Sequence, residues 1–163
     1  MHALALLTFA IAAATAPSPA AADERSCNGA IGRVAIDDDL RVPRGGNCTL
    51  DGTRIDGNLE VGRGATLSAA GIDLDGNLQA ENAASVTITG SRVDGNIQIE
   101  QSGSAHIADN RVDGNIQLER NDGRLVVSRN RIDGDLQCKQ NRSQPVGGGN
   151  TVDGDKEGQC AGL

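Results

Sequence analysis

The sequence predicts an all-β fold: a single parallel β-helix solenoid of about seven coils of 19–20 residues, with three short strands in each coil. A seven-residue phrase of the pattern apolar-Asp-Gly-Asn-apolar-polar-apolar recurs through the chain, with a degenerate first copy. The copies begin at Ile36, Ile55, Leu74, Val93, Val112, Ile132 and Val152. This spacing is typical of a solenoid, whose units bury their apolar faces only by stacking. At about 4.8 Å per coil the rod is roughly 30–35 Å long, and parallel crossovers favour right-handed winding.

Alternating apolar and polar residues predict the strands within each coil. Ile97 and Ile99 flank the polar Gln98, which is the pattern of a strand with one buried face. A second alternating stretch points residues such as Val86 and Ile88 inward. A third, very short strand leads into the next copy of the phrase.

The Asp-Gly-Asn segment is predicted to turn the chain at one corner of the coil. We expect its glycine to take a positive φ, because a Cβ would clash in that region. We expect its asparagine to stack on the asparagine of the next coil and to share amide hydrogen bonds. A second stack at another corner is predicted from Asn110, Asn130 and Asn150, which recur at one-coil spacing.

The first 22 residues differ from the rest and predict a signal peptide. The apolar stretch from Ala3 to Thr15 is too short to span a bilayer, and Ala20-Ala21-Ala22 fits the small-x-small cleavage rule. We expect residues 1–22 to be removed and residues 23–163 to be exported, to the periplasm or outside the cell. An uncleaved membrane anchor is the alternative. Within the domain, residues 23–35 and 159–163 are expected to cap the repeats at 36–158.

The composition of residues 23–163 limits both the core and the partners. These residues include no Phe, Trp or Tyr, so the core must consist of Val, Ile, Leu and Ala. The formal charge of −7 lies after the predicted cleavage site and disfavours nucleic acid and anionic membranes as partners. We expect a monomer that does not span a membrane and that binds an envelope or extracellular ligand.

Four cysteines lie in two pairs, one at each end of the repeats. Cys27 and Cys48 are 21 residues apart, and Cys138 and Cys160 are 22 apart, close to one coil. Residues one coil apart lie about 4.8 Å from each other, near the Cα separation that a disulfide requires. We predict the disulfides Cys27–Cys48 and Cys138–Cys160, which export permits. Four thiolates on zinc are the alternative, but the chain has no Cys-x-x-Cys pair.

Stacking places one aspartate of each coil in a row along the rod. Unit charges about 4.8 Å apart repel by roughly 0.9 kcal/mol even in water, so six neighbouring pairs cost about 5 kcal/mol. An arginine two residues before the aspartate offsets this repulsion in four coils, and Asp73 takes its place in one coil, which must borrow Arg54 or Arg92. The aspartates are Asp37, Asp56, Asp75, Asp94, Asp113, Asp133 and Asp153, and the arginines are Arg54, Arg92, Arg111 and Arg131. The row is therefore interpreted as turn caps neutralised by arginine.

The pattern breaks in the last two copies of the phrase. Thr151 stands where an arginine would precede Asp153, and aspartate replaces asparagine at the fourth position of the phrase. Two stacked Asp-Gly-Asp corners would bring Asp133, Asp135, Asp153 and Asp155 together. Because Ca²⁺ prefers clustered carboxylates, a weak calcium site at these four residues is a hypothesis.

No catalytic constellation is evident after the predicted leader. His106 is the one histidine there, Lys139 and Lys156 are the two lysines, and they suggest no nucleophile–base pair. The period varies by one residue, which leaves no room for the long loops that form the groove of β-helix enzymes such as pectate lyases.

The repeated phrase resembles secreted parallel β-helix repeat proteins of bacteria across residues 36–158. It is also faintly similar to the bactofilins, cytoskeletal β-helices that polymerise end to end, but the leader and the end cysteines depart from that family. We therefore predict a non-enzymatic exported structural or binding module, without a cofactor unless Ca²⁺ binds. A carbohydrate-active β-helix enzyme and a Ca²⁺-stabilised envelope module are the alternatives.

Overall fold

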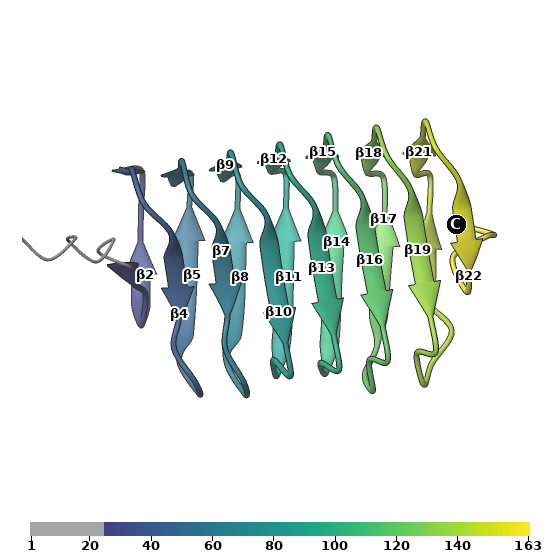
Figure 1. The fold of residues 1–163 in the computed structure, drawn as a ribbon, viewed down its shortest axis with the longest axis horizontal. Coiled ribbons are helices and arrows are strands. Elements are labelled where there is room, and N and C mark those ends of the chain that lie inside the picture. The colour runs from purple at the N-terminus through teal and green to yellow at the C-terminus, as the bar shows by residue number, and fades with distance from the viewer. Residues whose placement is uncertain (1–24) are drawn as a thin grey trace, which may run out of the picture.

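The computed structural model describes residues 25–163, and the predicted signal peptide lies outside them. The chain winds into a rod in which each coil contributes one strand to each of three parallel sheets (Figure 1). The predicted parallel β-helix is therefore confirmed. Among residues 25–163 there is no helix with the length and apolar character needed to cross a membrane.

The first sheet has eight strands. In chain order they are β1 (Arg25–Ser26), β4 (Leu40–Val42), β7 (Leu59–Val61), β10 (Leu78–Glu81), β13 (Ile97–Glu100), β16 (Ile116–Glu119), β19 (Leu136–Lys139) and β22 (Lys156–Gly158).

The second and third sheets have seven strands each. The second contains β2 (Gly29–Ile31), β5 (Asn47–Asp51), β8 (Thr66–Ala70), β11 (Ser85–Thr89), β14 (Ser104–Ala108), β17 (Leu125–Ser128) and β20 (Val146–Gly148). The third contains β3 (Ala35–Ile36), β6 (Arg54–Ile55), β9 (Asp73–Leu74), β12 (Arg92–Val93), β15 (Arg111–Val112), β18 (Arg131–Ile132) and β21 (Thr151–Val152).

We number the coils 1 to 7 from the first residue of each third-sheet strand, so that coil 1 begins at Ala35. The first corner is the Asp-Gly-Asn segment between a third-sheet and a first-sheet strand. The second corner joins the first sheet to the second, and the third corner joins the second sheet to the third. Equivalent residues stack without a shift, since Leu59 pairs with Leu78 and Leu78 with Ile97.

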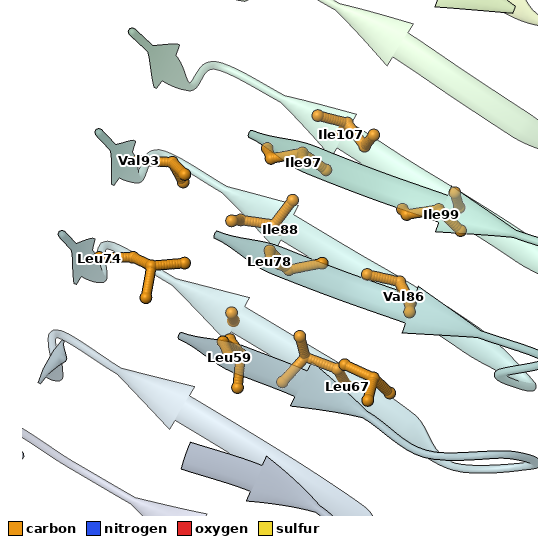
Figure 2. Packing of buried hydrophobic residues seen from close by; sticks show 14 of the residues in the cluster. Leu59, Leu67, Leu74, Leu78, Val86, Ile88, Val93, Ile97, Ile99 and Ile107 are labelled. Carbon is orange, nitrogen blue, oxygen red and sulfur yellow. The ribbon is translucent and has the colours of Figure 1, made fainter. Parts of the chain in front are cut away.

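Inward residues of all three sheets fill one continuous aliphatic core. Leu59, Leu78 and Ile97 of the first sheet form a column that faces Leu67 and Val86 of the second sheet (Figure 2). Because the coils are in register, each side chain packs on its equivalent in the next coil. The narrow interior is thereby filled without any ring, as the composition predicts.

Close stacking, and not a positive φ, explains the glycines of the first corner. The φ of Gly76 lies outside the left-handed region, so the sequence-based expectation was wrong. A Cβ at Gly76 would lie 2.4 Å from the carbonyl oxygen of Gly57 and 2.8 Å from Oδ1 of Asn58 in the preceding coil. Positive φ values occur instead at the other corners, for example at Asn82 (57°) and Gly90 (58°).

Asparagine side chains form ladders at the two predicted corners. At the first corner, Oδ1 of Asn77 accepts the backbone N–H of Asn96 at 2.8 Å. At the third corner, Oδ1 of Asn130 accepts the backbone N–H of Asn110 at 3.1 Å, and its Nδ2 donates to the carbonyl oxygen of Ile107 at 2.9 Å. Both predicted stacks are confirmed, and they satisfy backbone groups that the turns remove from the sheets.

A third ladder, which the sequence analysis missed, occupies the second corner. Oδ1 of Asn141 accepts the N–H of Asn121 at 3.0 Å, and Oδ1 of Asn121 accepts the N–H of Ser102 at 2.9 Å. These three residues are buried and recur at 20- and 19-residue spacing, which is the signal that could have revealed them.

Both predicted disulfides are present, and each closes one end of the core. The Cα–Cα distances are 5.5 Å for Cys27–Cys48 and 5.2 Å for Cys138–Cys160. The first bridge runs from the end of β1 in the first sheet to β5 in the second, so it crosses the interior and does not join stacked residues as expected. Two such bridges are consistent with an oxidising compartment.

The last coil ends the core with a polar residue. Lys156 pairs with Leu136 in the first sheet and so takes the place of the leucine or isoleucine of earlier coils. Its Nζ donates a hydrogen bond to the carbonyl oxygen of Asn150 at 2.9 Å, which satisfies the ammonium group at the end of the apolar column.

Candidate functional site: the charged row and the stepped corner

The aspartate row at the first corner is neutralised by arginines that each reach two coils. Arg54 Nε lies 2.8 Å from Oδ1 of Asp56, and its Nη2 lies 3.0 Å from Oδ2 of Asp75 in the next coil. Its Nη1 also lies 3.3 Å from Asp73, the residue expected to borrow an arginine. The hydrogen bond to Asp56 and the charges of Asp75 and Asp56 raise the pKa of Arg54.

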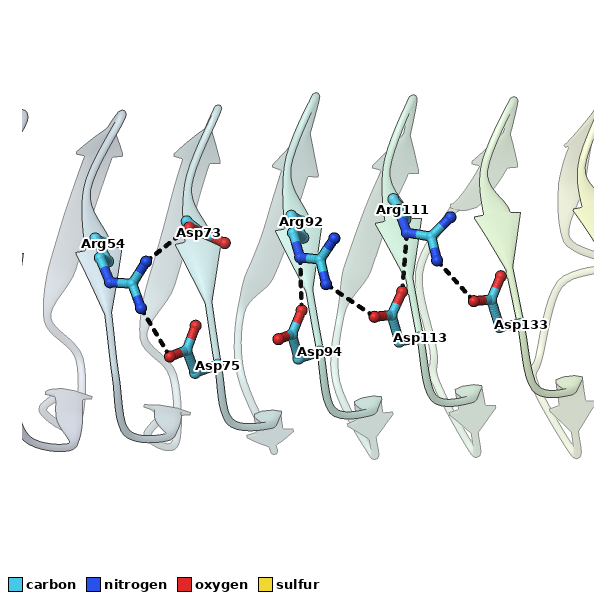
Figure 3. A network of polar contacts seen from close by, with 8 residues as sticks. All are labelled: Arg54, Asp73, Asp75, Arg92, Asp94, Arg111, Asp113 and Asp133. Atoms are coloured by element: carbon cyan, nitrogen blue, oxygen red, sulfur yellow. Dashed lines mark hydrogen bonds and ion pairs between the residues drawn. The ribbon is translucent and has the colours of Figure 1, made fainter.

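The same geometry continues along the rod (Figure 3). Arg92 lies 2.7 Å from Asp94 and 3.0 Å from Asp113, and Arg111 lies 3.0 Å from Asp113. The hydrogen bond to Asp94 and the charges of Asp94 and Asp113 raise the pKa of Arg92. Third-sheet strands are two residues long and end at the corner, so the arginine and the aspartate two residues later share a side.

The last row aspartate also has an arginine, contrary to the sequence-based expectation. Arg131 lies 3.4 Å from Asp153 in the following coil and 3.5 Å from Asp133 in its own. Asp133 also pairs with Arg111 at 2.8 Å. Thr151 therefore leaves no gap, because the arginine of the preceding coil bridges forward.

The other two calcium candidates belong to the asparagine ladder. Oδ1 of Asp135 accepts the backbone N–H of Asp155 at 2.9 Å, and the Asp135 N–H donates to Oδ1 of Asn115 at 2.7 Å. In residues 25–163 no three His, Cys, Asp or Glu side chains are grouped so that they could hold a metal ion. The structure thus offers no preformed cluster for the calcium hypothesis, which stays a prediction.

The outer face of the second sheet is free of charge in coils 2 to 4. Its outward residues on three adjacent strands are Thr66, Ser68, Ala70, Ser85, Thr87, Thr89, Ser104, His106 and Ala108. His106 is exposed on this face, beside a hollow of about 370 Å³ that Arg124 and Val126 also line. Small hydroxyl side chains dominate the face, and His106 is its one titratable group.

The second corner changes shape between coils 2 and 3. In coils 1 and 2 the positive φ falls on Gly45 (66°) and Gly64 (68°), whereas in coil 3 it falls one position earlier, on Asn82 (57°). First-sheet strands also lengthen from three residues in β7 to four in β10. The loops after β4 and β7 consequently extend beyond those after β10 and β13 (Figure 1).

This step leaves a hollow of about 300 Å³ at the boundary of coils 2 and 3. Its lining includes Gly62 and the charged residues Arg41, Glu60, Arg63 and Glu81. Arg41 Nη2 lies 3.0 Å from Glu60. This corner was not among the candidate sites predicted from the sequence, although the repeated Arg-Gly of Arg44-Gly45 and Arg63-Gly64 marks it.

Comparison of this chain with protein-family models, with curated proteins and with solved structures finds no match. Its function is therefore argued from the residues and their geometry, since a fold alone does not define a function.

Proposed function

We propose that this chain is a non-enzymatic exported module, a rigid rod with a structural or binding role at the cell envelope or outside the cell. One observation carries the proposal: most of the polar groups that recur along the rod are bound to one another. The arginines reach the aspartates of two coils, and the asparagines satisfy the backbone of the neighbouring coil. Repeated chemistry of this kind builds a scaffold.

The shape of the surface favours this role over a carbohydrate-active enzyme. The coils differ in length by one residue, so no inserted loop raises a wall beside the hollows. Glu81 and Glu100 are adjacent carboxylates beside a hollow of about 140 Å³. Glu100 is, however, held by Arg120 at 3.0 Å. A glycosidase uses two carboxyl groups, an acid and a base or nucleophile, and here one member of the pair is bound to a guanidinium.

The two ends of the rod support a discrete module over a filament. Ala35 and Thr151 occupy the arginine position in the first and last turns of the third sheet. Head-to-tail stacking would therefore place Asp153 against Asp37 with no guanidinium between them. Like charges at this spacing repel, so the row itself opposes end-to-end growth.

Binding without turnover is the test of this proposal. Residues 23–163 are incubated with an envelope fraction from the source cell and then sedimented. Co-sedimentation of the domain, with no release of reducing sugar ends, supports a binding module. Release of reducing ends that Glu81→Gln/Glu100→Gln abolishes would instead establish the carbohydrate-active enzyme and overturn the proposal.

A further inference from the structure

We propose that two copies of this chain pair side by side and antiparallel along the second corner, with a twofold axis between coils 2 and 3. The partner is thus a second copy of the chain. The proposal does not depend on the envelope role, since it rests on the charges and the step of this corner alone.

The corner begins with two cations that lack partners. Arg63 follows Arg44 by one coil, and the N–H of Gly45 donates to the carbonyl oxygen of Arg63 at 2.9 Å, which fixes their stacking. Both side chains are exposed. Within residues 25–163 no ion pair or side-chain hydrogen bond engages either guanidinium, unlike those of the aspartate row. Two such charges about 4.8 Å apart repel by roughly 0.9 kcal/mol in water, and no ion pair among the described residues offsets this repulsion.

The next two coils carry the opposite charge at the same corner. Glu81 and Glu100 are register neighbours at the ends of β10 and β13, and Arg120 of coil 5 lies 3.0 Å from Glu100, so a second copy would share that carboxylate. Position by position, Gly62 and Pro43 occupy the places of these glutamates in coils 2 and 1. The charge at this corner is therefore positive in coils 1 and 2 and negative in coils 3 and 4.

This order is self-complementary under a twofold rotation. Reversing one rod about an axis between coils 2 and 3 places coil 2 opposite coil 3 and coil 1 opposite coil 4. Arg63 then faces Glu81 of the second copy, and Arg44 faces Glu100 of the second copy. Because the contact is isologous, each pair occurs twice.

The step in the corner has the same symmetry as the charges. The loops of coils 1 and 2 extend outward, and those of coils 3 and 4 are set back (Figure 1). In the antiparallel pair the extended loops of one rod lie over the recessed corners of the other. The hollow beside Gly62 lies at the axis, where it can receive the Arg63 side chain of the second copy.

Neither other corner offers a comparable surface. At the first corner the arginines are bound to aspartates of two coils. At the third corner Arg129 makes two hydrogen bonds of 2.7 Å to Asp109, which lower the pKa of that carboxyl. At the second corner, two arginines without an ion pair in the described residues lie in the two coils before those of Glu81, which also has none, and Glu100, which Arg120 contacts.

The pairing is expected to be weak and to depend on salt. A contact along one edge belongs with small transient interfaces, below about 1,200 Å². Surface charges interact over a Debye length of about 30 Å at 0.01 M salt but about 3 Å at 1 M. Single rods, the sequence-based expectation, are therefore the high-salt form.

Sedimentation equilibrium of residues 23–163 tests the pairing through charge reversal. The wild-type domain should be dimeric at about 0.01 M salt and monomeric at about 1 M. Arg44→Glu/Arg63→Glu makes these positions acidic in all of coils 1 to 4, and Glu81→Arg/Glu100→Arg makes them basic, so each variant alone should be monomeric. An equal mixture of the two should form a heterodimer, because the acidic variant supplies carboxylates and the basic variant supplies guanidinium groups.

Arg124→Glu/Arg142→Glu is the matched control, since it reverses two charges at the same corner in coils 5 and 6, outside the four coils that pair, and should leave the dimer intact. Circular dichroism melts verify that each variant is folded, and Glu81→Arg alone replaces the basic variant if Glu100→Arg unfolds it. A monomeric wild type at low salt, a dimeric acidic variant or a mixture that stays monomeric would each overturn the proposal. Envelope binding by the folded acidic variant separates this outcome from failure of the module function.

Discussion

Replacement of Asn130 by alanine should destabilise the rod far more than replacement of a surface amide. Asn130 is buried at the third corner, where its Oδ1 accepts the N–H of Asn110 and its Nδ2 donates to the carbonyl oxygen of Ile107. Alanine removes both hydrogen bonds and leaves the Asn110 N–H buried without an acceptor, while the Ile107 carbonyl stays in the ladder between β14 and β17. An unsatisfied buried donor costs about 1–3 kcal/mol and a lost hydrogen bond about 1 kcal/mol, so the variant should lose roughly 2–4 kcal/mol of unfolding free energy.

Thermal unfolding followed by circular dichroism measures this loss. At about 2–4 °C per kcal/mol for a domain of this size, the midpoint should fall by roughly 4–16 °C. Gln117→Ala is the control, because this amide lies on the outer side of β16 and its substitution should change stability by no more than about 0.5 kcal/mol.

Asn130→Ser should recover part of the loss. Ser91 holds the equivalent place in an earlier coil, where its Oγ accepts the N–H of Ile72 at 3.1 Å. Equal midpoints for Asn130→Ala and Gln117→Ala would refute the view that the ladder holds the coils together.

Three further perturbations test other parts of the structure. Gly95→Ala should lower the free energy of unfolding in urea by about 1–3 kcal/mol or more, because its Cβ would lie 2.6 Å from the carbonyl oxygen of Gly76. Gly90→Asn has open space at its Cβ and should lower the free energy of unfolding less. The pKa of Asp109 is lowered in the folded state by its hydrogen bond with Arg129. The carboxylate therefore stabilises the fold above its unfolded pKa of about 4, and this stabilisation is lost as the pH falls through the folded pKa. The melting midpoint of Asp109→Asn should therefore lie below that of the wild type near pH 7 and coincide with it near pH 2; a gap that persists in acid would contradict this assignment. Cys138→Ser/Cys160→Ser should lose about 3 kcal/mol and expose the last coil first to hydrogen exchange, and unchanged protection there would show that the bridge does not secure that end.

The repeat made the coil predictable because stacking without a shift forces equivalent residues into equivalent environments. Alternation around Gln98 defined a strand, and a one-coil recurrence of asparagine predicted the ladder at Asn130. The cysteine pairing followed from spacing near one coil. Its path across the interior did not follow, because that depends on which sheet receives each cysteine.

The sequence repeat did not predict details that depend on backbone conformation. Gly76 was assigned a positive φ from its residue type, but contact with the preceding coil is what excludes a side chain there. Thr151 suggested an unpaired Asp153, yet a guanidinium long enough to bridge two coils lets Arg131 reach it. The step at Gly62 results from a turn that changes between coils 2 and 3, and such a change has no periodic signature.

The aspartate corners are scaffold, completed by arginines and backbone amides of the chain itself. Thermal melts of residues 23–163 in chelator and in millimolar calcium distinguish a scaffold from a calcium site. We expect coincident midpoints, because Asp133 and Asp153 are paired with Arg131 and the Asp155 N–H donates to Asp135. A calcium-dependent rise of the midpoint that Asp153→Asn/Asp155→Asn removes would contradict this expectation and would establish the calcium site at the last two corners.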